Sequence, residues 1–151
     1  MKMRFDIINK DAYTYEAQYN MAEMSFDIPN VSVDTHISVA YLNLGIDSED
    51  MIAKCVWGFS LMNSWQITNL TVPDYIDGGV RLVGLNEGGL ILRADKDKMW
   101  KSFFDKTTGW YCIGNFASEE GDTAVKITKN MIVVLNFFRH LKAIWIKPKF
   151  I

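Results

Sequence analysis

Alternating apolar and polar positions recur along this chain and predict short β-strands. The clearest pattern runs over residues 31–41, where Val31, Ile37 and Val39 share one phase with the other apolar or β-branched side chains. Polar residues fill the opposite phase, as in a half-buried strand. Similar patterns predict strands at residues 2–8, 13–20, 25–28, 65–72, 80–85, 90–94 and 110–114. A helix is the competing interpretation of 13–20.

The C-terminal block Thr123–Pro148 holds the densest run of strand-forming residues and predicts a β-hairpin with its turn at Asn136–His140. Met131–Leu135 is apolar on both phases, so we expect this strand to be covered on both faces. Phe137 and Phe138 occupy the turn. We expect them to fold back onto the core, because exposed apolar patches are uncommon on monomers. If exposed, they would be interface anchors.

Two segments raise the question of helices. Residues 51–59 suit either helical or strand spacing, but Trp57 and Phe59 favour a strand and Gly58 weakens a helix interior. Asp95 is placed to cap a short amphipathic helix ending near Lys106. The sequence therefore predicts an α+β fold in one domain, residues 1–151. Its main part would be an antiparallel sheet of about eight to ten short strands, with one or two short helices.

The amino-acid composition argues against several classes of function. The 151 residues are 49 % hydrophobic and 23 % charged, which is ordinary for a globular protein. The net charge of −2 and the lack of a basic cluster disfavour direct nucleic-acid binding. Cys55 and Cys112 lie among apolar residues and indicate buried free thiols, although one disulfide is the alternative. With no signal peptide and no apolar run of about 18 residues, we expect a cytoplasmic protein without a membrane span.

Catalytic patterns are lacking. His36 and His140 have no cysteine or second histidine nearby, so neither a metal site nor another cofactor site is expected. The cysteines have apolar neighbours, no nucleophile elbow occurs, and the glycines match no phosphate-binding loop. We therefore expect a protein that is not an enzyme.

Acidic loops are the remaining candidates. Their carboxylates are either simply solvated or placed to meet a basic partner surface and steer association. The candidate partner-binding residues are Asp47, Glu49, Asp50, Asp74, Asp77, Glu87, Phe116, Glu119, Glu120 and Asp122.

The C-terminal part of the chain resembles a known class of proteins. The segments WYCIGN at Trp110–Asn115, VKITKNMIVVL at Val125–Leu135 and LKAIWIKP at Leu141–Pro148, with an acidic loop between the first two, are similar to the closing strands of small bacterial immunity proteins. These belong to contact-dependent growth inhibition and other polymorphic toxin systems. The resemblance implies a cytoplasmic toxin inhibitor that binds the C-terminal domain of its cognate toxin, a nuclease or another toxic domain. It carries over no binding residues, because each immunity protein recognises its own toxin.

Two other functions stay open from the sequence. The first is a β-rich domain that binds or transforms a small ligand in a pocket lined by aromatic residues such as Trp57, Trp110 and Trp145. The second is an oligomerisation module, for which a homodimer is the simplest form.

Overall fold

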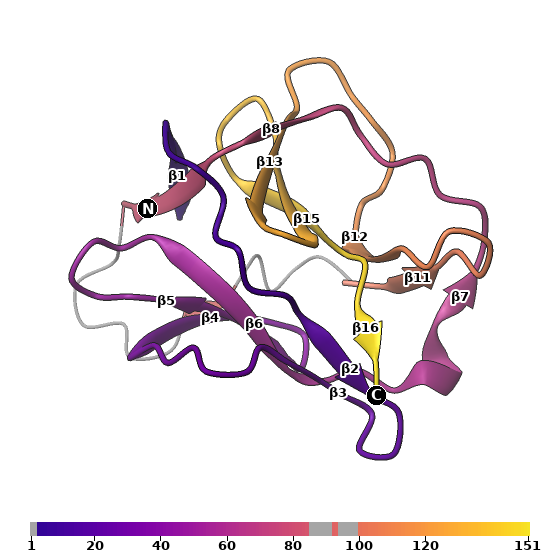
Figure 1. Cartoon of the computed structure of the whole chain (residues 1–151). Helices are drawn as coiled ribbons and strands as arrows, with labels where there is room; N and C mark the ends of the chain where they lie inside the picture. Colours follow the sequence, from indigo (N-terminus) through magenta and orange to yellow (C-terminus); the bar gives the residue numbers. More distant parts are fainter. Residues whose placement is uncertain (1–2, 85–91, 94–99) are drawn as a thin grey trace.

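Two seven-stranded sheets packed face to face form the body of the protein (Figure 1). The computed structural model describes residues 3–84, 92–93 and 100–151. Sheet I contains, in spatial order, β10 (Leu92–Arg93), β4 (Thr35–Val39), β5 (Leu42–Ile46), β6 (Ala53–Phe59), β3 (Ser25–Asp27), β2 (Gln18–Asn20) and β16 (Lys149–Phe150). Sheet II contains β7 (Gln66–Ile67), β11 (Ser102–Phe104), β12 (Tyr111–Gly114), β15 (Leu141–Ile146), β14 (Met131–Leu135), β13 (Thr123–Thr128) and β8 (Tyr75–Asp77).

A third, two-stranded sheet closes one flank. It pairs β1 (Arg4–Ile8) with β9 (Gly79–Val83) in antiparallel register. Strand β9 follows β8 after a single residue, so the chain runs from the edge of sheet II directly to this flank. Phe5 and Leu82 of the pair are buried in the core between the two large sheets.

Both large sheets are antiparallel inside and parallel at their edges. The four outermost pairs, β10 with β4, β16 with β2, β7 with β11 and β8 with β13, are all parallel. Each edge strand has only two or three residues. Such short edges offer little backbone for pairing with another chain, which limits both aggregation and strand addition.

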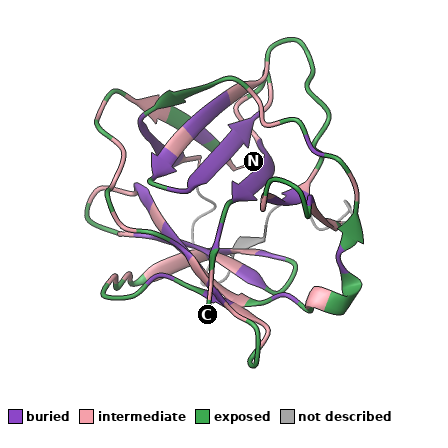
Figure 2. Ribbon diagram, turned by 45° about the vertical axis from the view of Figure 1, so that its right-hand side comes forward, coloured by how far each residue is buried: buried purple, intermediate pink, exposed green. Residues whose placement is uncertain are grey.

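Buried residues of both large sheets fill the core between them (Figure 2). In sheet I, Tyr19 and Phe26 point inward, and in sheet II Val133 and Ile144 face them as members of the same cluster. The opposite face of sheet II is also covered, because Leu70 and Val72 of segment 68–74 pack against it. Every residue of β14 is consequently buried, which confirms the expectation for Met131–Leu135.

Hydrogen-bonded aromatic residues join the two sheets. The Tyr19 hydroxyl donates to the Ser60 carbonyl at 2.6 Å, and the Trp65 indole N–H donates to the Ser60 hydroxyl at 2.9 Å. The Tyr111 hydroxyl lies 3.1 Å from Ser60 Oγ and 2.8 Å from Ser102 Oγ. Each of these polar groups therefore has a hydrogen-bond partner in an otherwise apolar interior, as is usual for buried polar groups.

The predicted fold class is wrong in its helical part. The chain is nearly all β, with sixteen strands in the described residues and only a 3₁₀ turn, η1 (Met62–Ser64), as helical structure there. Residues 94–99 of the expected helix lie outside the described part, but Ser102–Phe104 is strand β11. Adjacent Phe103 and Phe104 pack on opposite faces of sheet II. Because both faces are covered, consecutive aromatic residues suit a strand, and tertiary packing overrides the helical spacing.

The remaining segment predictions had mixed outcomes. The strand preference at 51–59 is confirmed by β6, but within 13–20 and 65–72 only the short strands β2 and β7 form. The strand at 80–85 is confirmed by β9, which pairs with β1, whereas Leu92 and Arg93 of the predicted strand 90–94 form β10 beside β4. The expected turn at 86–89 lies outside the described residues. The C-terminal block forms three antiparallel strands instead of one hairpin.

Candidate protein-binding site

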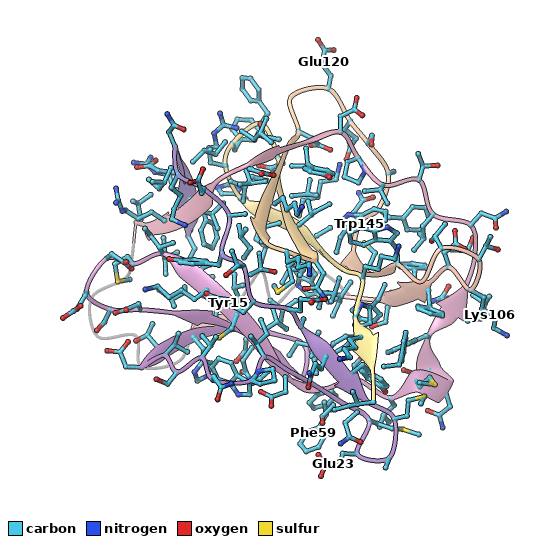
Figure 3. All side chains as sticks on the ribbon, viewed as in Figure 1. Tyr15, Glu23, Phe59, Lys106, Glu120 and Trp145 are labelled. Atoms are coloured by element: carbon cyan, nitrogen blue, oxygen red, sulfur yellow. The ribbon has the colours of Figure 1, made fainter. Side chains whose placement is uncertain are left out.

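Loop 115–122 and turn 136–140 lie against each other at one end of sheet II. A methyl group added at Gly121 would lie 2.8 Å from Phe137 Cβ, which places the loop backbone directly against this aromatic side chain. Arg139 Nη1 also donates to Thr123 Oγ1 at 3.0 Å, just after the loop. We call the surface formed by these two segments the acidic–aromatic end; Glu120 marks its tip in Figure 3.

The side chain of Asn136 explains how turn 136–140 forms without glycine. Its Oδ1 accepts the backbone N–H groups of Phe138 at 2.9 Å and His140 at 3.0 Å. Arg139 takes a left-handed conformation with φ of 66°. A short polar side chain that caps its own turn is the usual role of asparagine. The two phenylalanines are thereby held at the tip.

Lys142 organises the acidic loop. It is the extra residue of a β-bulge in β15, between the pairs Val134–Ala143 and Leu135–Leu141. Its side chain is 7 % exposed. The ammonium group donates to the Ala117 carbonyl at 2.7 Å, lies 2.8 Å from Glu119 Oε1, and forms a short ion pair with Asp122. The bulge thus directs a lysine into the loop rather than into the core.

The ion pairs keep Lys142 charged. Burial alone would lower the pKa of a lysine, but hydrogen bonds to Asp122 and Glu119 outweigh it and raise the pKa above its ordinary value. Glu119 N–H also donates to Asp122 Oδ2 at 3.0 Å. Asp122 is therefore a structural residue of the loop. Glu120, exposed and without a side-chain partner among the described residues, is free to meet another molecule.

A hollow of about 190 Å³ beside the loop brings together residues from separate candidate segments. Asp74, Phe116, Glu119 and Asp122 line it, with Trp145 also in the wall. Phe116 stacks edge-on against Phe103 with centroids 4.7 Å apart. Four of the ten candidate residues are thus assembled at one place, together with Glu120 at the loop tip.

The other candidates lie elsewhere. Asp47 and Asp50 lie in the turn between β5 and β6, where both carboxylates pair with Lys54 Nζ of β6, at 3.0 Å and 3.4 Å. Glu49 in the same turn is exposed. Asp77 is exposed on the edge strand β8. Glu87 lies outside the described residues.

The expectation that Phe137 and Phe138 return to the core is wrong. They are 71 % and 68 % exposed, with their rings in edge-on contact. The capped turn holds them away from sheet II, where every inward position is already filled. Sequence reasoning also missed Lys142, although its position as the single charge in the strand LKAIWI was a usable signal.

The two cysteines are poorly placed to act as nucleophiles. Cys55 and Cys112 are buried free thiols, as expected, and lie in different sheets. Burial raises the pKa of Cys55 to about 11 and that of Cys112 further, which suppresses the nucleophilic thiolate. Over the described ranges, no three histidine, cysteine or carboxylate side chains are grouped to hold a metal ion.

The three tryptophans of the ligand-pocket hypothesis do not share a cavity. Trp110 and Trp145 meet edge-on in the cluster beneath segment 68–74, whereas Trp57 packs with the other core cluster from sheet I. Among the described residues, no helix is long and apolar enough to cross a membrane.

No protein-family model matches the chain, and no curated protein matches it. The geometry of the acidic–aromatic end is therefore the basis for a functional proposal.

Proposed function

We propose that this protein is a cytoplasmic immunity protein that binds a cognate toxin domain, a nuclease domain with a basic surface, through the acidic–aromatic end. The observation that carries the proposal is the contact between loop 115–122 and turn 136–140, which joins exposed aromatic rings and carboxylates in one surface. The function is non-enzymatic, because inhibition requires only that the partner be covered.

The aromatic part supplies the affinity. Phe137 and Phe138 are the most exposed phenylalanines on this end, and Phe116 is partly exposed at the hollow beside it. Large rings that become desolvated in a complex are the usual anchors of a protein interface. Exposing two adjacent phenylalanines costs solubility in a free monomer, so a partner that covers them is the simplest reason to hold them there.

The acidic part supplies attraction to a basic partner. Glu119, Glu120 and Asp122 place three carboxylates on the loop, opposed by the ammonium group of Lys142. The surplus negative charge is exposed at Glu119 and Glu120. Rim charges of this kind accelerate association with a cationic surface and make the rate sensitive to salt.

The loop is also held in shape before binding. Asn115, Asp122 and Lys142 bond its backbone from both ends, at Ala117 N, Glu119 N and the Ala117 carbonyl. An ordered loop loses less conformational freedom on association, so more of its contact energy appears as affinity. A nuclease needs a basic surface to bind its phosphate substrate. An inhibitor that covers this surface with carboxylates and aromatic rings blocks access of nucleic acid.

Co-expression with a candidate toxin domain, taken from the C-terminus of a secreted protein encoded by a neighbouring gene, tests the proposal. The wild-type chain should protect cells and co-purify with the toxin domain. The double variant Glu120→Lys/Phe138→Ala should lose both properties, whereas Glu49→Lys/Tyr41→Ala, which makes the same changes at exposed sites elsewhere, should keep them. Failure of the wild type to bind or protect, or equal protection by the two double variants, would contradict it.

A further inference from the structure

A second hollow, of about 340 Å³, lies on the outer face of sheet I. Its labelled members Phe59 and Glu23 lie at the opposite end of the molecule from Glu120 in Figure 3. Its lining follows from strand alternation, because Tyr19 and Phe26 point into the core and their neighbours point outward. The outward positions that line it are Gln18 and Asn20 of β2, Ser25 and Asp27 of β3, and Trp57 and Phe59 of β6.

Gly58 shapes the hollow. It has a φ of 123° and lies opposite Phe26 and Leu42 in the two neighbouring strands. A methyl group added there would lie 2.5 Å from the Tyr41 carbonyl oxygen, so no larger residue fits. Trp57 and Phe59 flank this bare stretch of backbone and form an aromatic wall on β6.

The carboxylates at this hollow pair with no cation in the described part of the chain. Asp27 Oδ1 accepts the N–H of Ile28 at 2.8 Å, and the side chain of Glu23 makes no hydrogen bond or ion pair with the described residues. None of the described residues that line the hollow is basic. Lys149 lies beside Gln18 in the next strand, but it does not line the hollow and pairs with neither carboxylate.

This arrangement differs from the hollow at the acidic–aromatic end, where the Lys142 ammonium group forms an ion pair with Asp122 and lies 2.8 Å from Glu119. None of the described residues supplies a cation to the second hollow, which leaves its carboxylates open to a cation from another molecule. An aromatic wall beside unpaired carboxylates is the chemistry that recognises a cationic group.

We propose that the hollow on β2, β3 and β6 binds an arginine side chain carried by a protein segment. A planar guanidinium group stacks on a tryptophan face and donates to a carboxylate at the same time, which a lysine ammonium group does less well. The volume lies at the lower end of the roughly 300–1,000 Å³ of ligand pockets. Exposed Met21 and Ile151 adjoin the hollow, linked by the hydrogen bond from Met21 N to Ile151 O, and provide an apolar rim for the segment. This site is independent of the proposed function.

Amide and indole NMR shifts of the isolated chain test the proposal with three blocked peptides: acetyl-Gly-Arg-Gly-amide, its lysine analogue and its citrulline analogue. The arginine peptide should shift the Trp57 indole and Gly58 amide signals in a saturable manner. The lysine peptide should bind more weakly, and the neutral citrulline peptide should give no saturable shift. Equal shifts with arginine and citrulline, binding tighter with lysine, or no saturation at Trp57 would overturn it.

Variants at the hollow provide the matched test. Phe59→Ala should weaken binding of the arginine peptide about two- to fivefold, the effect of losing an exposed cation–π contact. Asp27→Asn keeps an oxygen for the Ile28 N–H, so it should retain the fold while weakening binding at least as much. Glu120→Gln, at the other end, should leave it unchanged. Unchanged binding in both hollow variants would refute the site, whatever the outcome for the toxin-binding surface.

Discussion

The side chain of Phe137 packs against the backbone of Gly121, so close that a methyl group on the glycine would lie 2.8 Å from Phe137 Cβ. This contact joins an acidic loop and an aromatic turn that are separated by two strands in the sequence. The contact joins the loop and the turn into one surface. Substitutions at its packed residues should change the stability of the protein, and substitutions at its exposed residues should change binding.

Gly121→Ala should destabilise the protein more than Gly109→Ala. Both glycines have positive φ, 89° and 83°, so each alanine variant bears the cost of about 1 kcal/mol for that conformation. Only at Gly121 must Phe137 also move, whereas the nearest atom at Gly109 is 3.9 Å away. Chemical denaturation should therefore show at least about 1 kcal/mol of additional loss for Gly121→Ala. Equal losses would show that the loop and turn are not packed together.

Lys142→Met should reduce the free energy of unfolding by about 2 kcal/mol, because it leaves the largely buried Asp122 carboxylate without its partner. The loss stays below that of a fully buried pair, since Glu119 faces water. Lys129→Met is the matched control, because its ion pair with Glu16 is exposed and should be worth less than about 1 kcal/mol. Similar losses in the two variants would contradict the structural role of Lys142.

Asp105 should make stability depend on acid. Its carboxylate accepts the N–H groups of Leu70, Thr107 and Thr108, and these bonds hold its pKa below the ordinary value of 3.8. A lowered folded-state pKa contributes stability above the unfolded value and loses it as the pH falls through the folded value.

Asp105→Asn should therefore be less stable than the wild type at neutral pH, and the difference should shrink below about pH 4. Urea unfolding at several pH values measures this. Asp77→Asn, an exposed carboxyl on β8, is the control and should have little effect at any pH. A wild-type advantage that persists undiminished in acid would exclude the assigned role.

Tyr111→Phe should cost about 1–2 kcal/mol, because it removes the hydroxyl that lies between Ser60 and Ser102 in the core. Burial raises the pKa of Tyr111 to about 12, so the hydroxyl stays protonated throughout the physiological range. Thermal unfolding of Tyr111→Phe beside Tyr41→Phe, whose ring is 83 % exposed, isolates the buried hydroxyl. A change no larger than that of Tyr41→Phe would argue against the network.

Local sequence patterns predicted those strands in which the β-propensity of the residues and their packing favour the same structure. Strand β6 contains β-branched and aromatic residues, which favour a strand. Met131–Leu135 is apolar at every position, which matches its burial on both faces of the sheet. Ser102–Phe104 could not be assigned in this way, because a strand covered on both faces lacks alternation and its i, i+4 aromatic pairs imitate a helix. The parallel edge pairs depend on contacts distant in sequence, which no local pattern contains.

The candidate site was predictable in composition but not in arrangement. The acidic loop and the Phe137–Phe138 pair could be recognised from the sequence, whereas their contact at Gly121 depends on how β13, β14 and β15 are registered. The exposure of the two phenylalanines depends on the Asn136 cap. The ion pairs of Asp47 and Asp50 with Lys54, seven and four residues later, distinguish these residues from Glu120, which looked equivalent in sequence.

Stopped-flow kinetics of binding to the toxin domain, at low and high salt, tests the role of the acidic–aromatic end most directly. Glu120→Lys should slow association about threefold or more and weaken its salt dependence, while Phe138→Ala should mainly raise the dissociation rate, by about tenfold or more. Glu49→Lys and Tyr41→Ala make the same changes elsewhere and should match the wild type. Wild-type kinetics in Glu120→Lys and Phe138→Ala, or equal effects in the controls, would contradict the account.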